Sequence, residues 1–401
     1  NMKYFKELIK GYNNFDSKNI TKECFNTKIK NIAYNSKLIK KDYIFVAIKG
    51  TKDDGHKYIE NAIENKANII IYDFRFDKKK IKELKNKYNK IFFVSAKNPR
   101  EMLAFISAKL FNEPTKKIKT IAITGTNGKT TTTYLLKSIL ENNKTTLIGT
   151  IKNMIGKREI KTNLTTPESI DLENIFNKSF KKNISNIVME TSSQALVMNR
   201  CDYLQFDTAI WTNITEDHLD YHKNMRNYLK AKLKLFDLLK ESCKKKKLAI
   251  VNIDTDYFKE ISNYIKKLNL KIITYGLNEK ADYYGKIISL NSKSTEYEFY
   301  AKGKFISKVK LSMLGRFNIL NSLSVLAYAC EYKLDIKKAI KSISKVQVAG
   351  RFEIVTNEKH DFIVAVDYSH TPDSLKGILY DHHLLHNHFH QLRHMHHDRI
   401  Q

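Results

Sequence analysis

The residues best suited to chemistry form a glycine-rich segment, Gly125-Thr126-Asn127-Gly128-Lys129-Thr130-Thr131, between an apolar run and a helical pattern. A loop of this kind points backbone N–H groups and a helix N-terminus at a phosphate. The Lys129 ammonium suits the β- and γ-phosphates of a nucleotide, and the Thr130 hydroxyl suits Mg2+. The strict spacing of the longer phosphate loop is absent because position 123 is Ile. The segment therefore predicts a shortened nucleotide-binding loop.

Two more polar segments follow apolar runs, namely METSS (189–193) and TNITEDHLDYH (212–222). In a parallel sheet the carboxyl ends of the strands share one edge, so Glu190 and His218 are expected to meet the loop and a metal ion there. Taken alone, a buried structural carboxylate is the less favoured alternative for Glu190, and Asp217 with His218 is a weaker signal because an Asp-His pair is common.

The elements that position these residues are predicted from alternating strand and helix patterns. Apolar runs at 43–48, 68–73 and 91–95 indicate a small α/β domain within residues 30–113. A polar stretch with Pro114 links it to a longer series of runs, at 120–125, 186–191, 207–214, 248–253 and 271–276. That series predicts a doubly wound, mostly parallel sheet. A last strand pattern at 361–368 resembles the start of a third domain.

Composition narrows the protein class. With 401 residues, 42% hydrophobic and 28% charged, the chain has room for several folded domains. Four dispersed cysteines without a CxxC pair exclude a readable disulfide scaffold or zinc ribbon. We found no secretory signal and no run near the length of a membrane span, so the expected location is the cytoplasm, without membrane insertion.

Charge and histidine distribution leave alternatives open. The formal net charge is +29, but the lysines are spread along the whole chain, which favours solvated faces over a dedicated nucleic-acid surface. Residues 382–397 hold eight of the 13 histidines at irregular spacing. We interpret residues 381–401 as a non-native tail, with a metal-binding tract as the alternative.

Read together, six motifs resemble the Mur ligases over about residues 30–380: TGTNGKTT, METSSQAL, TNITEDHLDYH, LGRFNILN, AGRFE and VDYSHTPDSL. They are most similar to the type that adds the third residue of the peptidoglycan stem peptide. The resemblance implies a UDP-substrate-binding domain (1–113) and a central ATP-binding domain (114–350). It also implies a hinge with the start of a truncated, Rossmann-like ligase domain (351–380).

The resemblance also implies a mechanism. ATP phosphorylates the D-glutamyl carboxylate of UDP-MurNAc-L-Ala-D-Glu, and an amine then attacks the acyl phosphate to give an amide. By resemblance Lys129 contacts the γ-phosphate, and Thr130 and Glu190 hold one Mg2+. His218 helps hold a second Mg2+, and Lys232 matches a lysine that the family carbamylates.

Further ligand contacts are assigned by resemblance alone. Asn318 and Asn321 would face the adenine, and Arg351 and Asp367 would reach the phosphates and ribose. The residues expected around the UDP are Tyr34, Ser36, Thr51, Lys52 and Asp53. Those expected to hold the muramoyl peptide are Thr165, Thr166, Ser192 and Arg200. Asn35 and Met198 stand where the family usually has Asp and Gln.

The expected partners are UDP-MurNAc-dipeptide and a diamino acid such as diaminopimelate or lysine, with no nucleic acid, and the chain is expected to be a monomer. By resemblance, the residues that select the amino acid lie in the third domain, so we expect this chain to bind the UDP-linked substrate but to ligate poorly. Rival functions are a folylpolyglutamate synthase-like enzyme, a muramoyl-ligase-like amidation subunit and a basic nucleic-acid-binding protein. The first-domain segments IFVAIKG and DDGH disfavour the synthase, and no nucleic-acid-binding motif accompanies the charge.

Overall fold

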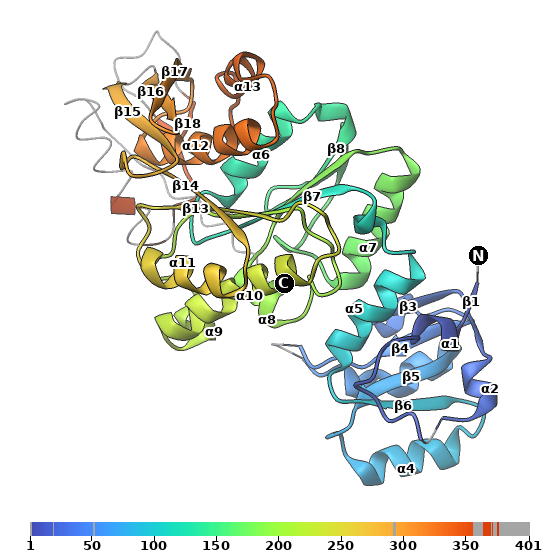
Figure 1. Cartoon of the computed structure of the whole chain (residues 1–401). Helices are drawn as coiled ribbons and strands as arrows, with labels where there is room; N and C mark the ends of the chain where they lie inside the picture. The colour runs from blue at the N-terminus through green and yellow to red at the C-terminus, as the bar shows by residue number, and fades with distance from the viewer. Residues whose placement is uncertain are drawn as a thin grey trace. The chain divides into compact units, whose positions relative to one another are not determined.

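The computed structural model of the chain describes residues 2–18, 20–50, 53–291, 294–355, 364–369, 371 and 375–376 (Figure 1). They separate into two units. The first unit comprises residues 1–117, 167–182 and 194–204, and the second comprises the rest. The predicted domain limits at residues 113, 350 and 380 stay predictions, and the histidine-rich segment 381–401 lies outside the described residues.

The first unit is built on a parallel four-stranded sheet in the order β3-β4-β5-β6. Its strands are β3 (Asn31–Ala33), β4 (Tyr43–Val46), β5 (Ala67–Asp73) and β6 (Phe92–Ala96). The three strands predicted from apolar runs are thereby confirmed. Ile69 and Ile71 lie in the core on one face of β5, and Ile70 lies in the core on the other face. A strand covered on both faces reads as a continuous apolar run, which explains the sequence signal.

Helices cover both faces of this sheet. One core contains residues of α1 (Phe5–Leu8) and α5 (Pro99–Leu110), and the other contains residues of α3 (Ile59–Glu64) and α4 (Lys78–Lys87). α5 begins where the Asn98 side chain accepts hydrogen bonds from the backbone N–H groups of Arg100 and Glu101. Pro99 at its first position favours the same start. The unit also contains β1 (Lys3–Tyr4), α2 (Lys22–Phe25), β2 (Lys28–Ile29), η1 (Ser36–Leu38), η2 (Gly55–Tyr58), η3 (Pro114–Lys116) and α7 (Ser169–Lys181).

The second unit contains an eleven-stranded sheet in the order β10-β9-β8-β11-β7-β12-β13-β14-β15-β16-β17. Its six central strands, β8 to β14 in that order, are parallel. These are β8 (Thr145–Ile148), β11 (Asn186–Glu190), β7 (Lys119–Thr124), β12 (Thr208–Trp211), β13 (Leu248–Asn252) and β14 (Lys271–Gly276). The doubly wound, mostly parallel sheet predicted from the sequence is confirmed.

Helices lie on both faces of the central strands (Figure 1). α6 (Lys129–Ile139), α12 (Arg316–Glu331) and α13 (Ile336–Ile343) pack together on one face. α10 (Met225–Glu241) and α11 (Phe258–Lys267) cover the other. The short helices are η4 (Asn142–Lys144), α8 (Ser193–Val197) and α9 (Leu219–His222). In the described part of the chain, no helix has the length and apolar character needed to cross a membrane.

Strands at the two ends of the sheet had not been predicted. β9 (Asn153–Ile155) and β10 (Arg158–Ile160) extend one end, and β15 (Tyr283–Leu290), β16 (Thr295–Ala301) and β17 (Lys304–Leu311) form an antiparallel meander at the other. A separate two-stranded sheet pairs β18 (Glu353–Ile354) with β19 (Ala365–Val366). Of the strand predicted at 361–368, residues 364–368 are described, and β19 forms at two of them.

The meander is tied to α12 by a buried hydrogen bond. Tyr297 and Phe299 of β16 are fully buried in the core that α12 shares. The Tyr297 hydroxyl lies 2.7 Å from Ser322 Oγ, and Ser322 Oγ donates to Ile319 O at 2.8 Å. Tyr297 therefore donates to Ser322, which leaves each hydroxyl with a partner.

This arrangement predicts an asymmetric pair of substitutions. Ser322→Ala should lower the free energy of unfolding by about 1–3 kcal/mol because it leaves the Tyr297 hydroxyl buried without an acceptor. Tyr297→Phe should cost less because Ser322 keeps Ile319 as its acceptor. In the Tyr297→Phe background, Ser322→Ala should then cost markedly less than it does alone. Denaturant titration of the four proteins measures these differences, and purely additive effects would contradict the assigned hydrogen bond.

Candidate functional site

The predicted phosphate loop joins β7 to α6, with Gly125 at a φ of 151° and Gly128 at a φ of 85°. Gly128 caps the N-terminus of α6 in a left-handed conformation that favours glycine. Lys129 Nζ donates to Gly125 O at 2.8 Å and to Thr126 O at 2.7 Å. The side chain therefore folds back over the loop, in the position from which it could contact a bound phosphate.

The segment after β12 holds this loop in place through hydrogen bonds. Asn213 Oδ1 accepts from Asn127 N at 2.8 Å, and Thr212 Oγ1 donates to Asn127 O at 2.6 Å. Thr126 Oγ1 lies 3.2 Å from both Thr215 O and the Tyr228 hydroxyl. Because β12 pairs directly with β7, the end of one strand fixes the geometry of the loop that follows the other.

Glu190, the last residue of β11, is fully buried beside the loop. Its Oε2 accepts from Thr130 Oγ1 and from Thr150 Oγ1, each at 3.0 Å, and its Oε1 accepts from Thr150 N at 2.9 Å. Carboxylate and hydroxyl oxygens are hard ligands of the kind that Mg2+ prefers, so this donor set fits the expected metal. The structure thus brings together the predicted pair Thr130 and Glu190. Sequence reasoning missed Thr150, which follows β8 at the same edge.

Lys232 lies on α10 with its side chain under the loop. It is 1% exposed, its Nζ donates to Gly125 O at 2.8 Å, and the Nζ stands 4.4 Å from the centre of the Tyr228 ring. Burial, with a further contribution from Lys129, places the pKa of Lys232 well below its usual value. Among predicted site residues, Lys232 and Lys129 thus share one carbonyl acceptor.

His218 immediately precedes α9 with a φ of 52°. Its Nε2 lies 3.4 Å from Asp217 Oδ2, and its backbone N–H donates to Asp217 Oδ1 at 2.8 Å. Burial lowers its pKa, and the charges of Lys129 and Lys232 act in the same direction. Within the described residues, no group of three or more His, Cys, Asp and Glu side chains is arranged to hold a metal ion.

The residues expected to contact the rest of the nucleotide lie close to the loop or to the β18–β19 sheet. A side chain built on Gly128 would stand 2.3 Å from Asn321 Oδ1, so Asn321 packs on the loop. Asn321 Nδ2 donates to Asn318 Oδ1 at 3.2 Å, and Arg351 Nη2 donates to Thr130 Oγ1 at 3.1 Å. Asp367 Oδ2 accepts from the backbone N–H of Phe352 at 2.6 Å.

The residues expected to hold the muramoyl peptide divide between the two units. In the second unit, Thr165 Oγ1 lies 3.0 Å from Thr150 Oγ1, and Thr166 Oγ1 donates to Glu190 O at 2.9 Å. Ser192 N donates to Thr166 Oγ1 at 3.1 Å. Thr165, Thr166 and Ser192 are therefore linked by hydrogen bonds to Glu190 or to its partner Thr150, whereas Arg200 belongs to the first unit.

In the first unit, Tyr34 donates its hydroxyl to Asp171 Oδ2 at 3.2 Å. Burial raises the pKa of Tyr34, and the negative charges of Asp171 and Glu168 raise it further. Arg200 Nε donates to Glu168 Oε1 at 2.9 Å, and Arg200 Nη2 contacts Met198 Sδ at 3.3 Å. Tyr34 and Arg200 therefore belong to one polar group, in which sequence reasoning missed both carboxylates.

The predicted UDP contacts near residues 35–58 are only partly described. Ser36 is buried, and its carbonyl accepts from Asn65 Nδ2 at 3.0 Å, while Asn35 caps η1 by accepting from the Lys37 N–H. Asp53 Oδ2 accepts from the Tyr58 hydroxyl at 2.6 Å. Thr51 and Lys52 lie outside the described residues.

Comparison with known proteins identifies relatives over most of the chain. The Mur ligase middle domain matches residues 123–329, and the catalytic domain of the Mur ligase family matches residues 28–110. A UDP-N-acetylmuramoyl-L-alanyl-D-glutamate–2,6-diaminopimelate ligase of Caldanaerobacter subterraneus is 38% identical over 356 residues, which cover 88% of this chain and 70% of the relative.

Two solved structures share the fold. One, with the same ligase name, superposes with a TM-score of 0.77 at 22% identity, covering 96% of this chain and 75% of its own. The MurF ligase of Thermotoga maritima in complex with ADP gives a TM-score of 0.59 at 21% identity, covering 88% and 74%.

The close approach of Asn321 to the loop predicts a selective effect at Gly128. Gly128→Ala should weaken ATP binding, measured as ATP-dependent thermal stabilisation, because alanine is strained at this φ and its Cβ would meet Asn321 Oδ1 at 2.3 Å. Gly303→Ala is the matched control, with a φ of 78° and no neighbour within 4 Å. Both variants should lose about 1–2 kcal/mol of stability from the backbone alone. Equal ATP responses in the two variants would contradict the prediction.

Proposed function

This chain belongs to the Mur ligase family, and from that premise we propose that it adds a diamino acid to UDP-MurNAc-L-Ala-D-Glu. The product carries the third residue of the peptidoglycan stem peptide, formed through an acyl phosphate. The single observation that carries the proposal is the contact of Thr130 with Glu190 at 3.0 Å, directly beside the Lys129 loop. These groups are the ones that a phosphoryl transfer from ATP requires at the strand ends.

ATP and Mg2+ supply the transferable phosphoryl group and the charge that neutralises it. Thr130 and Glu190 would hold the metal, with Thr150 orienting the carboxylate through two hydrogen bonds. Lys129 would place its ammonium against the γ-phosphate, and the loop N–H groups would bind phosphate oxygens. The chain's contribution to the reaction is thus mainly positioning and electrostatic stabilisation.

Lys232 supports a second proposal about the metal site. We propose that its amine reacts with CO2 to form a carbamate, with a new N–C bond and the release of one proton. With His218, that anion would hold a second Mg2+. The support is the resemblance together with the burial of Lys232 against the loop at Gly125. Because Lys232 is buried, it is not an ordinary solvent-exposed lysine on a helix surface.

The substrates follow from the relatives and the first unit. We propose 2,6-diaminopimelate as the added amino acid because that acceptor stands in the names of the similar ligases. We place the UDP-linked substrate at Tyr34, Asp53 and Arg200 of the first unit. We further propose a cytoplasmic monomer, as expected for an enzyme that acts on nucleotide-linked precursors.

The proposed role of Lys129 has a direct test. Lys129→Ala should lower the rate of ADP release at least about 100-fold, because losing one group that stabilises charge in the transition state slows catalysis by that factor. The fold should stay intact. Circular dichroism and the thermal midpoint check the fold. Lys259→Ala, an exposed lysine of α11, is the control and should keep its activity. Undiminished ADP release by Lys129→Ala would exclude the proposed phosphate contact.

The carbamate predicts chemical rescue. Lys232→Ala should lose ADP release, and added formate or acetate should restore part of it because a short carboxylate can replace the carbamate as a metal ligand. Lys230→Ala, on the exposed side of the same helix, should neither lose activity nor respond to these salts. Full activity of Lys232→Ala without any added carboxylate would exclude a metal-binding role for this residue.

A further inference from the structure

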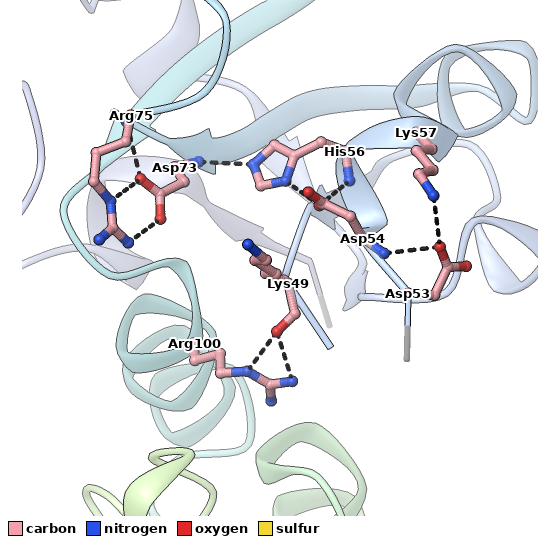
Figure 2. A network of polar contacts seen from close by, with 8 residues as sticks. All are labelled: Lys49, Asp53, Asp54, His56, Lys57, Asp73, Arg75 and Arg100. Carbon is pink, nitrogen blue, oxygen red and sulfur yellow. Dashed lines mark hydrogen bonds and ion pairs between the residues drawn. The ribbon is translucent and has the colours of Figure 1, made fainter. Parts of the chain in front are cut away.

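Arg100 at the start of α5 joins two segments of the first unit that are far apart in sequence. Its Nε and Nη2 donate to the carbonyl of Lys49 at 3.4 and 3.2 Å (Figure 2). Its Nη1 donates to Glu168 Oε1 and Oε2 at 3.1 and 3.2 Å. The Arg100 side chain is 15% exposed, and its guanidinium group donates through three nitrogens to two partners, of which Glu168 is 8% exposed.

Glu168 connects Arg100 to a predicted substrate residue. Its Oε1 also accepts from Arg200 Nε at 2.9 Å. The side chains of Glu168 and Arg200 are 8% and 11% exposed. Two guanidinium groups thus surround one carboxylate, and these charge-assisted hydrogen bonds fix the direction of Arg200.

Lys49 connects Arg100 to a second predicted substrate residue. Lys49 forms an isolated bridge with Asp54, and Gly50 N donates to Asp53 O at 2.7 Å. Arg100 therefore holds the backbone at Lys49, on the N-terminal side of Asp53. Figure 2 shows Arg100 against Lys49 and the Asp54–His56 pair on the outgoing side.

The outgoing side of this segment is fixed independently. Asp73 N donates to His56 Nε2 at 3.1 Å, so the ring proton is on Nδ1, which donates to Asp54 Oδ1 at 2.6 Å. His56 thus ties Asp54 to the end of β5, whereas Arg100 binds the Lys49 carbonyl on the other side of Asp53.

We infer that Arg100 is a positioning residue for the UDP-linked substrate. It acts on Arg200 through Glu168 and on Asp53 through the Lys49 carbonyl. An arginine suits this role because its planar guanidinium group carries several N–H donors that can reach two acceptors at once. The inference rests on the proposed function, in which Asp53 and Arg200 contact that substrate. A purely structural ion pair is the competing explanation.

The test compares Arg100→Ala and Arg100→Lys with the unaltered chain. Calorimetry with UDP-MurNAc-L-Ala-D-Glu should show affinity about 10- to 100-fold weaker for Arg100→Ala, because charge-assisted hydrogen bonds that orient Arg200 are lost. The affinity for ATP should stay unchanged, because the proposed ATP-binding loop lies in the second unit. Arg100→Lys should recover only part of the loss, since one ammonium cannot serve both partners.

Arg75→Ala is the matched control. The Arg75 side chain is 71% exposed and makes a two-nitrogen ion pair with Asp73, and within the part of the chain that the structure describes it bonds neither Lys49 nor Glu168. This variant should bind the UDP-linked substrate as the unaltered chain does.

A double-mutant cycle separates positioning from mere stabilisation. If Arg100 acts through Arg200, the loss of affinity from Arg100→Ala should be at least about threefold smaller in the Arg200→Ala background. Equal losses in both backgrounds, or unchanged affinity in Arg100→Ala and Arg100→Lys, would overturn the assignment while the proposed function stands. If Arg100→Ala does not fold, Arg100→Lys with its own cycle decides the same question. Failure of the unaltered chain to bind the substrate would overturn the proposed function and the assignment with it.

Discussion

Parallel pairing of β11, β7 and β12 determines what the second unit can do. Glu190 pairs opposite Ile123 and Trp211 opposite Thr124, so the residues that follow the three strands meet at one edge. That register brings the Glu190 carboxylate, the glycine-rich loop at 125–131 and the Asn213 amide together, although they lie tens of residues apart in the sequence. A shift of one residue in any of these strands would turn its side chains to the opposite face and separate the groups.

The parts of the fold that sequence reasoning predicted are those with strong local signals. Buried parallel strands read as unbroken apolar runs, and the GTNGKTT segment combines the glycines, lysine and threonine that a phosphate loop requires. β8 was missed because TTLI is short and half polar, and with it Thr150, whose position depends on that strand. The β15–β17 meander was missed because its strands mix charged residues, lysine or glutamate, with aromatic ones, so that no apolar run stands out from the polar surroundings.

The polar group of the first unit could not have been predicted for a different reason. Arg100 and Glu168 are 68 residues apart, and their contact exists only because α7 packs beside α5. Asn98 and Pro99 predict where α5 begins but say nothing of what its first arginine meets. Arg200 and Tyr34 were found through resemblance, whereas the carboxylates that orient them, Glu168 and Asp171, required the folded structure.

β17 is the last strand of the sheet in the described part of the chain, and its position bears on the lysine-rich composition. A strand with unpaired backbone groups along one side can template intermolecular pairing, and exposed Phe305 and Ile306 would favour such contacts. Lys304, Lys308 and Lys310 are exposed on the same strand. A second copy docking edge to edge would bring these like charges together, so the lysines oppose fibrillar aggregation at this edge. Part of the net charge of +29 thus acts to keep molecules of this chain apart from one another.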